Sequence, residues 1–162
     1  MTKPPSPRPL SVKVIAILLL ASGVGGLIAK TVQILAILVQ EKPYTEIESV
    51  FGILISGWPA AFVSLLVFLV TLVLGIGLWH RKELVRRVAI GWYAYCIFNS
   101  FLELFSPAIR AFYLQNLDIS VATFRIVVSL AILTILRLIV IWFLIKRKSA
   151  FVKPMISSPA SA

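Results

Sequence analysis

The sequence predicts an all-α integral membrane protein with four transmembrane helices in one bundle and both chain ends in the cytoplasm. Hydrophobic residues make up 60% of the 162-residue chain and charged residues 14%, against roughly 45–50% and 25% in soluble domains. Four long apolar stretches alternate with short basic segments. This alternation is typical of a polytopic membrane protein, because loops rich in Lys and Arg stay on the cytoplasmic side.

Eleven of the sixteen basic residues fall in three such segments: Lys3, Arg8 and Lys13, then Arg81, Lys82, Arg86 and Arg87, and finally Lys146, Arg147, Lys148 and Lys153. They place both ends and the middle loop on one side of the membrane, which we expect to be the cytoplasmic side of a bacterial inner (plasma) membrane. The net charge of +10 is better explained by retention of these loops in the cytoplasm and by their attraction to anionic lipid than by binding to nucleic acid.

The four spans are expected at residues 12–39, 58–79, 88–105 and 121–145, with disordered tails at 1–9 and 149–162. The first span is interrupted only by Lys30. Its start resembles a cleavable signal peptide, but the apolar run is much longer than the 7–15 residues that are typical of one. The second has a tryptophan at each end, as interfacial anchors should be, and the third stops before Pro107.

The two connections on the far side carry apolar residues at helical spacing: Ile47, Val50, Phe51 and Leu54 in the first, and Ile109, Phe112, Tyr113 and Leu117 in the second. Each is predicted to be a short amphipathic helix in the membrane interface. Alternatively, the first connection lengthens the second span, which would then kink at Pro59.

Small and polar residues form stripes on three spans when placed at 100° per residue. The stripes are Ser22, Gly26, Lys30, Gln33 and Gln40; Gly57, Ser64, Thr71 and Gly75; and Trp92, Cys96, Asn99, Glu103 and Ser106. Lipid tails cannot satisfy polar groups, so these stripes are expected to face one another. Ala21, Gly25 and Ala29 form a second small-residue stripe on the opposite side of the first span, for a neighbouring span or a second copy.

Four ionisable residues lie inside the predicted spans: Lys30, Glu103, Arg125 and Arg137. The first three share a level towards the outer face, with Asn99 one turn from Glu103. Together they form either an outward-facing pocket for a polar solute, ion or proton, or an ion pair with snorkelling side chains. Arg137 lies about 12 Å above the cytoplasmic end of its span. It needs backbone carbonyls, cavity water, a lipid phosphate or an acid on a partner protein.

No catalytic, metal or cofactor site is predicted. Cys96 and His80 are the only cysteine and histidine, so paired-thiol chemistry and a His- or Cys-based metal site lack ligands. No Ser/His, Cys/His or paired-carboxylate arrangement is present, and the chain is therefore not expected to be an enzyme.

Two segments carry a resemblance: Arg8-Pro9-Leu10-Ser11-Val12, and Gly75-Ile76-Gly77-Leu78-Trp79 followed by Arg81, Arg86 and Arg87. They resemble small bacterial inner-membrane proteins of four spans that have no established activity. The resemblance implies a four-helix architecture and transfers no site residues. Small multidrug transporters have a glutamate in the first span, where this chain has Lys30.

The expected function is a non-enzymatic accessory or scaffold subunit of a membrane assembly. Its partners would be the lipid bilayer and another membrane protein or a second copy of the chain. The alternative is a small transporter or channel that uses the pocket around Glu103 and Arg125.

Overall fold

The computed structural model describes residues 10–41, 43–45, 47–107, 119–148 and 151, with the side chains of 104 and 119–126 left aside. In this part of the chain the elements are α1 (Leu10–Val39), β1 (Ile47–Val50), β2 (Ile53–Ser56), α2 (Trp58–Trp79), α3 (Glu83–Phe105) and α5 (Ile119–Lys146). The fold is thus mostly helical, and the hairpin corrects the all-α prediction.

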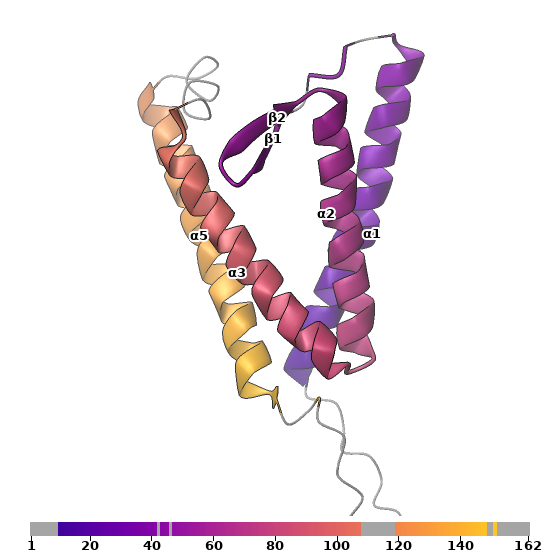
Figure 1. Ribbon diagram of the computed structural model, residues 1–162, viewed down its shortest axis with the longest axis vertical. Coiled ribbons are helices and arrows are strands. Elements are labelled where there is room, and N and C mark those ends of the chain that lie inside the picture. The colour runs from indigo at the N-terminus through magenta and orange to yellow at the C-terminus, as the bar shows by residue number, and fades with distance from the viewer. Residues whose placement is uncertain (1–9, 42, 46, 108–118, 149–150, 152–162) are drawn as a thin grey trace, which may run out of the picture.

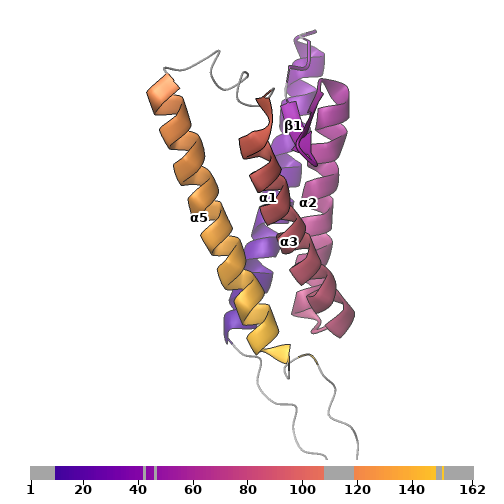
Figure 2. The ribbon, with the colours of Figure 1, turned by 60° about the vertical axis from the view of Figure 1, so that its left-hand side comes forward.

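The helices are arranged as two pairs that diverge from a common end. α1 packs against α2, and α3 packs against α5. The pairs meet where α1 starts, α2 runs into α3, and α5 ends, and they separate towards the other end, where the hairpin lies between them (Figures 1 and 2). We call these the joined end and the open end. The start of α1 and the end of α5 share the joined end.

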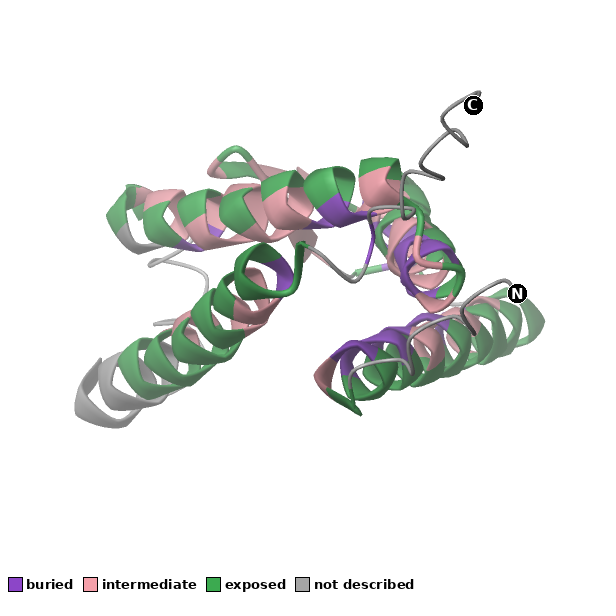
Figure 3. Cartoon of the chain, turned by 90° about the horizontal axis from the view of Figure 1, so that it is seen from below, coloured by how far each residue is buried: buried purple, intermediate pink, exposed green. Residues whose placement is uncertain are grey.

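Buried apolar side chains gather at the joined end. The cluster consists of Val12, Ile15, Ala16, Leu19, Leu74, Leu78, Ala89, Leu144 and Phe151. It draws on all four described helices and on Phe151, which lies in the predicted tail 149–162. The other residues of the two predicted tails, 1–9, 149–150 and 152–162, lie outside the description. Seen along the molecule, burial is concentrated where helices touch, and their outward faces are exposed (Figure 3).

Glycines bring α1 and α2 into close contact. A Cβ built on Gly23 would lie 2.8 Å from Cα of Leu72, and one built on Gly75 would lie 2.9 Å from the backbone nitrogen of Leu20. Both distances are too short for any side chain. Because lipid tails are as apolar as leucine, such close van der Waals packing is what holds two helices together in a membrane.

The predicted stripes are only partly right for this contact. Lys30, Ser64 and Gly75 are buried, as expected, but Ser22 is exposed, and its neighbour Gly23 makes the contact instead. The second small-residue stripe on α1, Ala21, Gly25 and Ala29, is exposed. Helix spacing alone locates a packed face to within one residue. The close approach to Leu72 determines that Gly23, and not the adjacent Ser22, lies in the contact.

The segment 47–56 is a β-hairpin, so both predictions for it, an interfacial helix and an extended second span, are wrong. Strands β1 and β2 pair antiparallel, with Ile47 opposite Ser56 and Val50 opposite Ile53. Phe51 and Gly52 both have positive φ, of 52° and 73°, as a two-residue hairpin turn requires. Its isoleucines and valine favour strands, and a segment this short can match the helical period by chance.

The α2 helix has the predicted bounds, and Pro59 starts it rather than kinking it. Gly57 caps the helix with a φ of 71°, and Pro59 lies in the first turn, where its missing N–H leaves no hydrogen bond unmade. Helix α3 begins at Glu83, five residues before the predicted span, and ends with it. Helix α1 begins two residues early and ends as predicted, and α5 begins two residues early and ends one residue late. The second predicted interfacial helix falls on 108–118, outside the described residues.

Three helices are long and apolar enough to cross a membrane: Leu10–Val39, Trp58–Trp79 and Val127–Lys146. This statement covers the described residues and rests on length and composition. Helix α3 is not among the three; it carries Glu83, Arg86, Arg87 and Glu103. The fold therefore supports a multi-pass membrane protein.

The glycine contact makes a first prediction. We expect Gly23→Ala to lower the free energy of unfolding by about 1–3 kcal/mol, the usual cost of overpacking, because the new methyl group meets the backbone of Leu72. Gly25→Ala is the matched control on the same helix, since its Cβ meets nothing within 4 Å; it should be neutral or stabilising by about 0.5–1 kcal/mol. Unfolding in detergent measures both. Equal effects of the two substitutions would contradict the packing described.

Candidate functional site

Asn99 ties the hairpin to α3. Its Nδ2 donates to the carbonyl oxygen of Ser49 at 3.2 Å and to Oε1 of Glu103 at 2.8 Å. Its Oδ1 accepts a hydrogen bond from the Gly52 N–H at 3.4 Å. One amide thus serves a backbone carbonyl, a backbone N–H and a carboxylate. Asn99 and Glu103 meet because they lie one turn apart on one helix face, as the sequence predicted.

Glu48 ties the same hairpin to α2, since its carboxylate accepts a hydrogen bond from the hydroxyl of Ser64, and Ser64 is buried. We call Glu48, Ser64, Asn99 and Glu103 the hairpin cluster. It bridges the two helix pairs at the open end and holds two carboxylates. The sequence analysis missed Glu48 as a site residue, because it treated the segment as an interfacial helix.

Lys30 and Arg125 were predicted to lie near Glu103, and the structure describes a contact for the first of them only. The buried Lys30 ammonium lies 3.5 Å from the hydroxyl of Tyr44 and donates to it. The Tyr44 ring in turn stacks on Trp58, with 5.2 Å between ring centroids. Arg125 belongs to α5, but its side chain lies outside the described residues. The predicted meeting of Glu103 and Arg125 therefore stays a prediction.

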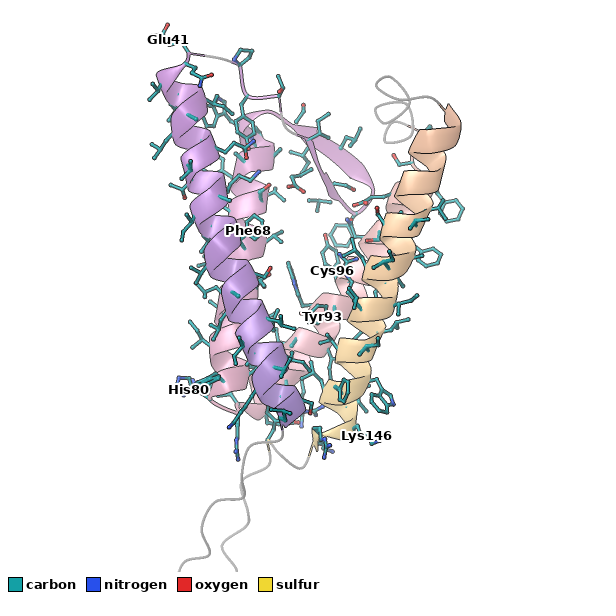
Figure 4. The ribbon with its side chains drawn as sticks, turned by 180° about the vertical axis from the view of Figure 1, so that it is seen from behind. Glu41, Phe68, His80, Tyr93, Cys96 and Lys146 are labelled. Atoms are coloured by element: carbon teal, nitrogen blue, oxygen red, sulfur yellow. The ribbon has the colours of Figure 1, made fainter. Side chains whose placement is uncertain are left out.

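Arg137 links α5 to α3 in the middle of the second pair. Its Nη1 donates to the carbonyl oxygen of Cys96 at 3.1 Å and to the hydroxyl of Ser100 at 2.7 Å. A carbonyl has two lone pairs, so the Cys96 oxygen can accept this bond without giving up its place in the helix. Both of these hydrogen bonds use Nη1, so in the described part of the chain Nε and Nη2 of Arg137 take no part in them. Figure 4 labels Cys96 and Tyr93 on the α3 side of this contact.

Of the partners considered for Arg137, the structure provides a backbone carbonyl and adds Ser100. The sequence analysis missed Ser100, although it lies four residues after Cys96, one turn along α3. That spacing is the signal that identifies it, because side chains four residues apart share a helix face.

Arg86 fastens α3 to α5 at the joined end. Its Nε and Nη2 bond both carboxylate oxygens of Glu83 at 2.6 and 2.7 Å. Its Nη1 donates to the carbonyl oxygen of Leu144 at 3.2 Å. That carbonyl belongs to the last turn of α5, where carbonyls lack helical partners and the dipole favours a cation. Arg87 adds a second bond to Glu83 at 3.0 Å. We call Arg86, Arg87, Glu83 and Leu144 the joined-end clamp.

The clamp holds the Glu83 carboxyl ionised. The hydrogen bond from Arg86, followed by that from Arg87, lowers the pKa of Glu83 from 4.5 to about 2. This outweighs the desolvation, which acts in the opposite direction. The same pair raises the pKa of Arg86, which is charged at every ordinary pH.

Comparison of the chain with protein-family models, curated proteins and solved structures finds no match. The resemblance to small inner-membrane proteins thus remains at the level of a small protein with three membrane-spanning candidates. In the described part of the chain, no three His, Cys, Asp or Glu side chains gather to hold a metal ion. The fold and these polar contacts define a small polytopic membrane protein.

The low pKa of Glu83 makes a second prediction. Because the folded-state value lies below the unfolded one, the clamp should contribute full stability above about pH 4.5 and lose it as the pH falls through about 2. Glu83→Gln should therefore be less stable than the wild type at pH 7, and the difference should shrink towards pH 2. Thermal unfolding in detergent across this range measures it.

The control is Glu41→Gln, which removes an exposed carboxylate at the other end of the molecule. It should follow the wild-type curve. A constant gap between Glu83→Gln and the wild type from pH 7 to pH 2 would show that the ion pairs do not stabilise the fold.

Proposed function

We propose that α3 also crosses the membrane, in a four-span protein of the bacterial inner membrane with the joined end in the cytoplasm. The 23 residues of α3 span about 35 Å, enough to cross a hydrocarbon core of about 30 Å and to leave the first turn, with Glu83 and Arg86, outside it. Lys13, Arg81, Lys82 and Lys146 all lie in elements or turns of the joined end. This concentration of basic residues supports the orientation.

Within that membrane, the proposed function is a non-enzymatic accessory or scaffold subunit that holds a partner helix against α5. The observation that carries the proposal is the exposure of α5. In the most apolar stretch of α5, within Val127–Lys146, only 6% of the residues are buried, against 28% in the corresponding stretch of α1 and 33% in that of α2. A helix that packs so little within its own chain has most of its surface left for lipid or for another protein.

Arg137 gives that surface a specific feature. An arginine in a span is costly, by about 2.5–3.5 kcal/mol at the centre on insertion scales, so it is expected to be paired. Here the two hydrogen bonds to α3 both use Nη1, which leaves the donors of Nε and Nη2 out of that contact. A carboxylate or a free carbonyl on a partner helix would complete the fork.

His80 lies at the joined end, away from the hydroxyl of Ser64 in the hairpin cluster. A serine nucleophile needs a base such as histidine beside it, so this separation supports a non-enzymatic role.

A second candidate function, a small transporter or channel for a cation or proton, is favoured by the hairpin cluster. Glu48 and Glu103 both lie there, on the hairpin and on α3, between the two helix pairs. Carboxylates at membrane depth mark ion and proton pathways in transporters. This candidate includes the predicted pocket of Glu103 and Arg125.

The accessory function makes a third prediction, that Arg137→Leu reduces recovery of partner protein in a gentle-detergent pull-down at least tenfold. The lost charge-assisted hydrogen bonds are worth about 1.5–3 kcal/mol each. Arg147→Leu removes the same charge from the exposed end of α5 and should leave recovery unchanged. Arg137→Lys keeps the charge but loses the fork, so it should recover little partner if the geometry matters. Undiminished recovery with a folded Arg137→Leu would refute docking at this residue.

Glu103→Gln separates the two candidate functions and is the fourth prediction. Its amide oxygen can still accept the bond from Asn99, so the accessory function predicts only a modest change in stability and normal assembly. The transport function predicts loss of cation or proton flux into proteoliposomes, because the ionisable group is gone. Flux that is measurable in the wild type and abolished in Glu103→Gln would establish transport. Absence of flux in both, with assembly intact, would count against transport through the hairpin cluster and leave the accessory function as the better supported one.

A further inference from the structure

A groove runs along the outer side of the α1–α2 pair near the joined end. It has a volume of about 470 Å³, within the range of about 300–1,000 Å³ that is usual for small-ligand sites. The groove is open and almost wholly apolar. Its lining includes Ile17, Ala21 and Val24 from α1, and Ile76, Trp79 and His80 from α2. Within the described part of the chain, α1, α2 and the adjoining His80 are its whole lining.

The groove exists because α1 and α2 touch at Gly75 and present larger side chains beside that contact. A Cβ on Gly75 would lie 2.9 Å from the backbone nitrogen of Leu20. The next residue, Ile76, and the small Ala21 across from it border the groove. A narrow helix contact flanked by isoleucine, valine and tryptophan leaves an open apolar channel along the pair, about two turns of α1 in length, against which part of an acyl chain can lie.

Basic side chains stand where this channel meets the joined end. Lys13 lies on the same face of α1 as Ile17, Ala21 and Val24, within an arc of roughly 80°, and one turn beyond Ile17. It is exposed. On the other helix, His80 borders the groove and projects outward from the end of α2 (Figure 4).

Nothing among the described residues neutralises this rim. Exposed Lys82 follows His80 by two residues. The acid of this turn, Glu83, is held by Arg86 and Arg87 in the joined-end clamp. The rim is therefore positive at the level where the apolar groove ends, as a basic pocket for a lipid head group is.

We propose that this groove binds an anionic phospholipid, with one acyl chain along α1 and α2 and the phosphate beside Lys13 and Lys82. The lipid lies in the leaflet that faces the joined end. Trp79 stands at the depth of the head groups, where indole rings are favoured. This binding needs no partner protein and no transport, so it stands apart from both candidate functions.

The experiment is native mass spectrometry of the full chain released from nanodiscs that contain equal amounts of phosphatidylglycerol and phosphatidylcholine. The wild type should retain phosphatidylglycerol in clear preference. Replacing Lys13 and Lys82 together by glutamine should lower that retention roughly thirtyfold, since each lysine near the surface contributes about 1 kcal/mol. The matched control, Arg147→Gln with Lys148→Gln, removes the same charge from exposed positions of the same end and should retain the lipid.

A second pair of variants tests the groove itself. Ala21→Phe fills it from an exposed position and should abolish retention of both lipids, whereas Ala29→Phe, also exposed and two turns away, should not. Equal retention of the two lipids by the wild type would overturn the proposal, as would equal losses in the test and control variants. So would a dimer without bound lipid, because a second copy would then occupy the groove.

Discussion

The joined-end clamp is the contact on which the rest of the architecture depends. Arg86 is nearly buried and joins the first turn of α3 to the last turn of α5. Apolar packing cannot select that arrangement alone, since lipid surrounds leucine as favourably as another helix does. A guanidinium fork can, because its donors need carboxylate and carbonyl oxygens at fixed positions. With this end fixed, the position of the second helix pair follows from the direction of α3.

The open end is held by a different kind of contact. There the hairpin stands between the pairs, bonded to α2 through Glu48 and to α3 through Asn99. Arg137 adds a further polar link between α3 and α5. Close glycine packing thus joins α1 to α2, and α2 to α3 where Gly77 meets Val85, whereas the open end relies on hydrogen bonds. Of the three apolar helices, α5 has the smallest share of buried residues, and its surface is therefore the proposed site for a partner helix.

The helices were predictable because apolar length and flanking charge are local properties of a sequence. The bounds of α2 agree with the prediction, and the polar spacing of Asn99 and Glu103 placed them together. The hairpin was not predictable from the spacing of its apolar residues, since four such residues fit a turn of helix as well as two short strands. The positive φ of Phe51, which marks the turn, is visible only in the structure. A turn signal at Phe51-Gly52 was weak, because the usual first residue there is Asn, Asp or Gly.

The roles of the arginines were beyond the sequence for another reason. Arg86 looked like one of several topology-setting cations, and only tertiary structure shows that it meets Leu144, 58 residues away. For Arg137 the sequence predicted the need for a partner, while the choice of Ser100 depends on how α5 is rotated against α3. Long-range pairing of this sort is set by packing geometry, which composition does not encode.

The hairpin also sets the spacing of the open end in discrete steps. Successive side chains of a strand point to opposite faces, and successive carbonyls point alternately towards and away from the paired strand. In β1 the Glu48 side chain reaches Ser64, and the next residue offers its carbonyl to Asn99. Inserting one residue between Ser49 and the turn would reverse both directions and break both links, whereas inserting two residues in each strand would preserve them. The length of the hairpin can therefore change only in steps of two residues per strand if its links to α2 and α3 are to be kept, and the distance between the helix pairs at the open end changes in the same steps.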